Sequence, residues 1–288
     1  MKRYMIFLLI FILLISIGCQ TINGKSPLEK VLVFKGENAG YASLNSKDGS
    51  LLVNYSDLKG NKGIYWYKDK KIINRIPNVM DGSVSPNGDY YSFYNKSENM
   101  LYIFKENGQL MNKFNIEGFT SGSTWSYDSK YIYWDEYGEK YIYRIDIFTG
   151  TKELILESKR IYNSPVAINN PDILYLLERI SPNDSDSDSN IVKYDLKNNK
   201  IEKVILPPIK DLFIFDSYSI SPNGKIAVFP DEHSGNMYVI DIMKNKIIDT
   251  IMMPDPSHPQ KYSWESDSSY FIFNVTGQEI DKYTIPKH

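Results

Sequence analysis

From residue 30 onward the chain alternates apolar and polar positions over short stretches, without a long segment of helical periodicity. One unit recurs: an apolar stretch, a polar turn, and a second stretch rich in Tyr, Ile and Phe. This alternation, together with the content of β-branched and aromatic residues, predicts antiparallel strands joined by tight turns. The six turn residues are Asp48, Asn87, Asp128, Asn170, Asn223 and Asp267.

The turns carry a recognisable chemistry. Two copies, Ser85–Gly88 and Ser221–Gly224, read Ser-Pro-Asn-Gly in full. Pro presets φ, Asn bonds to its own backbone, and Gly takes a positive φ freely. Two more strand-like runs follow most turns, for example those from Met100 and from Gln109. Four strands in a period of about 40 to 45 residues are typical of propeller blades.

The repeat resembles those of TolB-like and WD-repeat propellers, which place a Ser-Pro-Asp-Gly turn after the innermost strand. The resemblance covers nearly all of the chain after Gly24 and implies an all-β, six-bladed β-propeller. It assigns the innermost strands to segments rich in Ser, Gly and Ala, which suit a crowded axis. Those segments are YASLN, DGSVS, GSTWS, SPVAI, SYSIS and KYSWE, which begin at residues 41, 81, 122, 164, 217 and 261.

The last repeat, from Tyr262, has only three strands before the chain ends. A separate strand-like segment, Lys30–Gly36, lies before the first repeat. We expect this segment to supply the outermost strand of the last blade, because pairing there removes an exposed sheet edge. The propeller domain is therefore predicted over residues 30–288.

The first 18 residues resemble a bacterial signal peptide. Lys2 and Arg3 precede an apolar run that is too short to cross a bilayer. The run ends in Ser16-Ile17-Gly18-Cys19, which resembles a lipobox, although Ser16 stands where that motif usually has Leu. The resemblance implies cleavage before Cys19 and its lipidation with diacylglycerol and a fatty acid such as palmitate. Residues 19–29 would then tether the domain to the extracytoplasmic face of the cell membrane.

Cys19 is the only cysteine, so the domain has no intramolecular disulfide. The net charge of -2 gives no basic field for nucleic acid, and three scattered histidines do not suggest a metal site. The sequence contains no phosphate-binding loop, dinucleotide glycine motif or Gly-x-Ser-x-Gly elbow. We therefore expect no cofactor and no metal, and we identify no catalytic residue.

The three longest connections all follow a second or a fourth strand, so the propeller pattern places them on one rim, on blades four to six. Functional loops on a rigid scaffold commonly form a binding surface, and tolerated insertion is the alternative explanation. The candidate ligand-binding residues in these connections are Asp184, Asp186, Asp188, Asp211, Phe213, Phe215 and His258.

Several of these residues have a second interpretation. The Asp184–Asp188 loop resembles the start of a calcium loop, but it lacks the turn Gly and the later Glu, and it also fits a solvated loop. Phe213 and Phe215 fit either the core or an apolar patch. Trp125 and Trp264 occupy equivalent places before their turns, which indicates repeat packing, with a sugar platform as the alternative. Trp66 and Trp134 fall within predicted strands and are expected in the core.

The pattern as a whole predicts a membrane-anchored lipoprotein whose propeller binds a protein, a peptide or a glycan at the cell envelope. An envelope glycan hydrolase or lyase on the same fold is the alternative. A pair of catalytic carboxylates is defined by its separation in space, which a linear sequence does not reveal.

Overall fold

The computed structural model describes residues 28–35, 39–56, 62–77, 79–95, 97–116, 123–136, 141–158, 160–179, 189–209, 214, 218–231, 234–253, 262–274 and 279–286. Every regular element in these ranges is a β-strand. Within them, no helix is long and apolar enough to cross a membrane.

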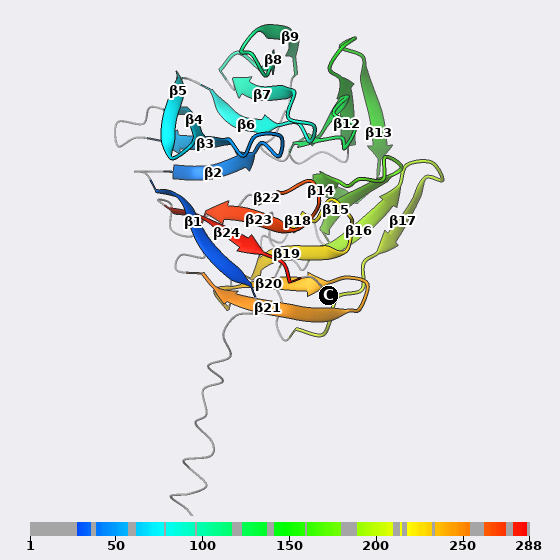
Figure 1. Cartoon of the computed structure of the whole chain (residues 1–288). Coiled ribbons are helices and arrows are strands. Elements are labelled where there is room, and N and C mark those ends of the chain that lie inside the picture. The colour runs from blue at the N-terminus through cyan, green and yellow to red at the C-terminus, as the bar shows by residue number, and fades with distance from the viewer. Residues whose placement is uncertain are drawn as a thin grey trace, which may run out of the picture.

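The strands form six four-stranded antiparallel sheets that follow one another around a ring (Figure 1). Blade one contains β2 (Ala39–Leu44), β3 (Leu51–Ser56), β4 (Lys62–Lys68) and β5 (Lys71–Pro77). Blade two contains β6 (Met80–Val84), β7 (Tyr90–Asn95), β8 (Met100–Lys105) and β9 (Leu110–Asn115). Blade three contains β10 (Thr124–Trp125), β11 (Tyr131–Asp135), β12 (Tyr141–Asp146) and β13 (Lys152–Glu157).

Blade four contains β14 (Ile161–Ala167), β15 (Ile173–Arg179), β16 (Ser189–Asp195) and β17 (Lys200–Lys203). Blade five contains β18 (Ser219–Ile220), β19 (Ile226–Asp231), β20 (Asn236–Asp241) and β21 (Lys246–Met252). Blade six contains β22 (Tyr262–Trp264), β23 (Tyr270–Asn274) and β24 (Glu279–Thr284), with β1 (Glu29–Lys35) beside β24. The innermost strands of neighbouring blades contact one another, for example β2 with β6 and β14 with β18. The prediction of an all-β, six-bladed propeller is confirmed.

The core is divided among the blade interfaces. In the described part of the chain, an apolar cluster lies between each pair of neighbouring blades. Successive residues of a second strand point to opposite faces of the sheet, so each blade packs on both sides. Leu51 and Val53 join the cluster with blade six, whereas Leu52 joins the cluster with blade two. Trp134 is fully buried between blades two and three, so its predicted core position is confirmed.

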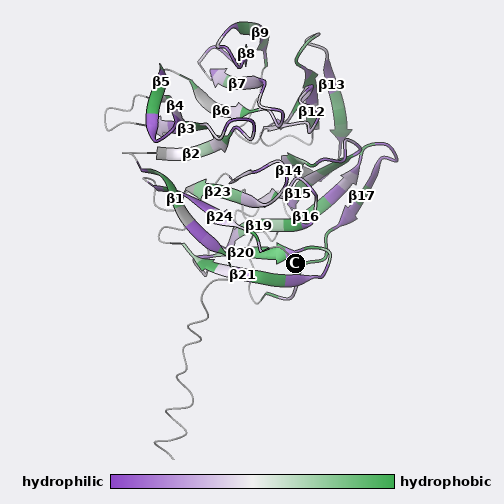
Figure 2. Ribbon diagram, in the orientation of Figure 1, coloured by the Kyte–Doolittle hydropathy of each residue, from purple (hydrophilic) through white to green (hydrophobic). Residues whose placement is uncertain are grey.

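The outer strands are less well covered. Hydrophobic residues remain on them, as the green parts of β13 and β21 show in Figure 2. Leu154 on β13 is 49% exposed and Met252 on β21 is 81% exposed. Burial therefore increases from the outermost strand of a blade to its second strand, β19 being buried throughout.

β1 lies beside β24 in antiparallel register, from Glu29 opposite Thr284 to Lys35 opposite Glu279. Phe34 on β1 is 3% exposed and packs in the cluster between blades six and one. Leu32 on the same strand is 50% exposed. Lys30 Nζ lies 2.8 Å from a carboxylate oxygen of the buried Asp281.

Candidate functional site

The turn between the first and second strand of each blade is held by its own side chains. In blade two the Ser85 hydroxyl donates to Asn87 Oδ1 at 2.8 Å and accepts from the backbone N–H of Tyr90 at 3.0 Å. Gly88 closes the turn with a φ of 73°. Ser221 and Asn223 repeat the hydroxyl-to-amide bond in blade five at 2.9 Å. These turns are therefore structural, as their composition predicts.

Side chains of the innermost strands link one blade to the next around the axis. The Ser43 hydroxyl of blade one accepts from the backbone N–H of Val84 in blade two at 3.0 Å. The Ser263 hydroxyl of blade six accepts from the N–H of Leu44 in blade one at 2.9 Å. Because these bonds join adjacent sheets, they hold the inner strands in register around the ring.

Two tryptophans make the same kind of link at equivalent places. The indole N–H of Trp125 donates to the Ser83 hydroxyl at 3.0 Å, from blade three to blade two. The indole N–H of Trp264 donates to the Ser219 hydroxyl at 3.0 Å, from blade six to blade five. The predicted repeat packing of the two tryptophans is confirmed. The link between blades two and three is equivalent to the link between blades five and six.

A second bond repeats in the same two places. The backbone N–H of Asn87 donates to the Ser129 hydroxyl at 3.2 Å, and that of Asn223 donates to the Ser268 hydroxyl at 3.1 Å. Ser129 and Ser268 both have a positive φ, of 60° and 65°. Blades two and three thus resemble blades five and six in these contacts.

A cavity of about 210 Å³ lies where the innermost strands meet. All six blades contribute to its lining, through the ends of the innermost strands and the turns that follow them. We call it the axial cavity, and we call the side of the ring that carries these turns the turn face. Tyr127, 42% exposed, and the exposed Ser266 lie in two of these turns and mark the mouth.

The described side chains that line the axial cavity are all uncharged. They combine apolar groups such as Val166 and Ile220 with aromatic rings and hydroxyls. Eight serines contribute, namely Ser43, Ser46, Ser83, Ser85, Ser123, Ser219, Ser263 and Ser266. Such a lining offers fixed hydrogen-bonding groups on an apolar background, which is the usual composition of small-molecule sites.

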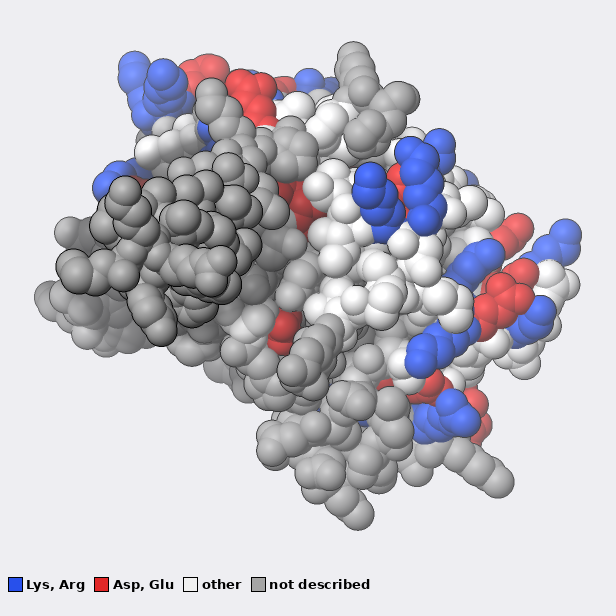
Figure 3. Space-filling model, turned by 90° about the horizontal axis from the view of Figure 1, so that it is seen from below, with Lys and Arg blue, Asp and Glu red and all other residues white. Residues whose placement is uncertain are grey.

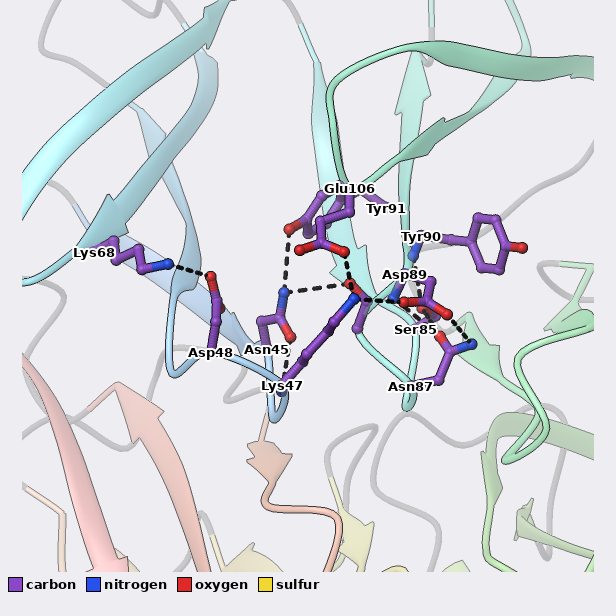
Figure 4. Close-up of polar contacts among 11 residues, drawn as sticks. Asn45, Lys47, Asp48, Lys68, Ser85, Asn87, Asp89, Tyr90, Tyr91 and Glu106 are labelled. Atoms are coloured by element: carbon purple, nitrogen blue, oxygen red, sulfur yellow. Dashed lines mark hydrogen bonds and ion pairs between the residues drawn. The ribbon is translucent and has the colours of Figure 1, made fainter.

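A charged network on the turn face joins blades one and two (Figure 4). Lys47 Nζ lies 2.5 Å from Glu106 Oε2 and 2.9 Å from Asp89 Oδ1. The hydrogen bonds to Glu106 and Asp89 raise the pKa of Lys47. Nearby, the Asn45 amide donates to the Tyr91 hydroxyl at 3.1 Å. Since Lys47 is largely exposed, these ion pairs orient the two turns more than they stabilise them.

Aspartates in the turns between third and outer strands recur on the same face. Partial burial by itself would raise the pKa of Asp146, but hydrogen bonds from Thr149 and Phe148 outweigh it and lower that pKa. The pKa of Asp195 is lowered chiefly by its hydrogen bonds from Asn198. In Asp241 the bonds from Lys244 likewise outweigh burial, and the pKa is lowered. These carboxylates serve as turn caps.

Charges of both signs lie side by side on the surface seen in Figure 3, mostly toward the edge. Uncharged residues occupy much of the described area between them. This pattern matches the small net charge of the chain.

The candidate residues from the long connections, Asp184, Asp186, Asp188, Asp211, Phe213, Phe215 and His258, all lie outside the described residues, as does Cys19. The axial cavity opens instead through the short turns, which connect the first strand of a blade to its second. Sequence reasoning attributed the small residues of the inner strands to crowding and missed their hydroxyls. The signal was present in the recurrent serines of these segments.

The chain matches no protein-family model and no curated protein. It is similar in structure to the β-propeller domain of Cps50 (Swd1) from Myceliophteria thermophila, with a TM-score of 0.60 and 10% sequence identity. The match covers 90% of this chain and all of that one. The fold is a β-propeller. At this identity the similarity concerns the fold alone.

Proposed function

We propose that the protein is a lipid-anchored, extracytoplasmic binding module whose ligand or partner engages the propeller at the axial cavity. The observation that supports this proposal is that all six blades line one uncharged, partly open cavity. Ligand sites are typically concave and largely preformed, with few but well-placed polar groups. Propellers commonly serve as binding scaffolds, and this site is held by hydrogen bonds between blades.

A glycan and peptide array tests this proposal directly. The full chain, extracted in detergent, should bind a subset of the array. Ser266→Trp adds a large side chain at the exposed mouth and should abolish those signals. Ser97→Trp is the matched control, because Ser97 is exposed in the turn between β7 and β8, away from the turn face. Equal binding by the chain and Ser266→Trp would place the site elsewhere.

The anchor belongs to the proposal on the strength of the lipobox resemblance at Cys19. A tether of about ten residues, at about 3.3 Å each, would keep the propeller within about 30 Å of the membrane. A lipid with two chains suffices for stable anchoring. Fatty-acid labelling of the chain and of Cys19→Ser tests it, since the label and the processing should both disappear in the variant. An unlabelled, full-length wild-type protein in the medium would refute the anchor.

Ring closure by β1 is also proposed. Its support is the register with β24 and the burial of Phe34 against blade one. Closure would place the tether at the outermost strand of blade six, next to the membrane anchor.

The rim predicted to carry the three longest connections, on blades four to six, is a second candidate surface for a larger partner. Phe213→Ala and His258→Ala on the same arrays test it. If these two variants lose binding while Ser266→Trp binds like the wild type, the ligand is recognised at that rim.

A further inference from the structure

The lining of the axial cavity restricts the charge of its ligand. A charged group that enters loses hydration, and the described lining offers no opposite charge in return. A ligand with hydroxyl groups and apolar C–H faces meets no such penalty, because the lining carries both kinds of partner.

The hydroxyls are fixed in place by their neighbours. Three serine hydroxyls each accept a single hydrogen bond from the next blade. The donor is a backbone N–H for Ser43 and Ser263, and the indole N–H of Trp264 for Ser219. A serine hydroxyl that accepts one bond still carries its own O–H as a donor. Because the accepted bonds hold the serine oxygens in place before a ligand arrives, only the O–H has to rotate, which limits the entropy lost on binding.

Aromatic rings supply the apolar side of the site. Tyr127, Tyr262 and Trp264 all contribute to the lining, and Tyr127 is 42% exposed. Blades three and six match at Trp125 and Trp264 but differ at the mouth, where Tyr127 of blade three corresponds to Ser266 of blade six. A ring-shaped ligand would therefore have its larger aromatic contact on the side of blade three.

The cavity volume limits the ligand to a compact group. A space of about 210 Å³ equals about seven water molecules of liquid, which accommodates one sugar ring. An extended peptide needs a groove or a free sheet edge to pair its backbone. This cavity is instead surrounded by the six blades and opens at its mouth on the turn face.

We propose that the axial cavity binds an uncharged sugar residue at the end of a glycan. The serine hydroxyls bond to the hydroxyls of the sugar, and Tyr127 packs on its C–H face. This inference rests on the proposed function, since it takes the axial cavity as the binding site.

The proposal is tested by titrating the full chain with uncharged monosaccharides and disaccharides. Calorimetry and tryptophan fluorescence are the two readouts. Glucuronic acid and glucosamine serve as charged counterparts, and short capped peptides serve as the other class of probe. We expect the uncharged sugars alone to bind. Tyr127→Ala should weaken them about fivefold, the loss of one aromatic contact. The fluorescence change should vanish in the Trp125→Phe/Trp264→Phe double variant and persist in Trp66→Phe.

Several outcomes would overturn the proposal. Binding of no uncharged sugar at millimolar concentration would do so, as would equal binding of the charged sugars. If the protein binds peptides and Ser266→Trp abolishes that binding, the axial cavity is still the binding site but the proposal of a sugar ligand is wrong. If sugars bind but neither Ser266→Trp nor Tyr127→Ala changes their affinity, the axial cavity is not the binding site and both proposals are wrong. Melting temperatures of the variants show whether each is folded.

Discussion

The indole N–H of Trp264 donates to the Ser219 hydroxyl at 3.0 Å and thereby ties blade six to blade five. Trp125 and Ser83 repeat this bond between blades three and two at the same distance. Both pairs border the axial cavity. The contacts that hold the ring together are therefore also the contacts that shape its candidate site.

Trp264→Phe removes this bond and should lower the free energy of unfolding by about 1 kcal/mol. Trp66→Phe is the matched control. Both side chains are partly buried, and the indole N–H of Trp66 has no partner among the described residues. Denaturant titration measures the difference. A loss in Trp66→Phe as large as that in Trp264→Phe would show that ring size, and not the bond, sets the effect.

Phe34→Ala tests closure of the ring by β1. Removal of a buried Phe side chain from the cluster between blades six and one should cost about 3 kcal/mol. Leu32→Ala, on the same strand but half exposed, should change stability by less than about 0.5 kcal/mol. Thermal unfolding of both variants measures this. If Phe34→Ala melts like the wild type, β1 does not dock against blade one.

Gly88→Ala tests the turn of blade two. A Cβ at Gly88 would lie 2.3 Å from Asn45 Oδ1, and the residue has a φ of 73°. Gly108 also has a positive φ, of 81°, but no atom within 4 Å of its built Cβ. Gly108→Ala should therefore lower the free energy of unfolding by about 1 kcal/mol, the cost of a positive φ in alanine. Gly88→Ala adds a steric clash and should lower it by at least about twice as much. Equal losses in denaturant titration would contradict the close packing of blades one and two.

The turn aspartates predict acid sensitivity. The lowered pKa values of Asp146, Asp195 and Asp241 mean that the folded state holds fewer protons than the unfolded state. Their contribution is complete above the ordinary Asp pKa of about 3.9 and is lost as the pH falls through their lower folded values. Melting temperature followed from pH 7 downward, at about unit steps, measures this loss. The triple variant with Asn at these positions should show a flatter profile; an unchanged slope would refute the assignment.

The strand pattern was predictable because alternation of period two is local. Leu51, Leu52 and Val53 face alternate neighbours, and this follows from their order in the chain. The turns were also predictable, because Pro, Asn and Gly act on their own backbone. The equivalence of Trp125 and Trp264 was visible from their shared place before the turn.

The axial cavity was not predictable in the same way. Ser43 and Val84 lie on different blades, and their hydrogen bond exists only because the ring brings two innermost strands together. Small inner residues are required by crowding at the axis whether or not they bond. Which of them carry hydroxyls toward a common space depends on the twist and closure of all six sheets.

Hydrogen exchange of the full chain, with and without the strongest array ligand, tests the central claim most directly. If the ligand occupies the axial cavity, exchange should slow at the backbone amides around its mouth, at Ser46, Tyr127 and Ser266, and the long connections should be unaffected. Slowed exchange confined to residues 180–188 and 254–261, with the mouth unchanged, would contradict the axial site.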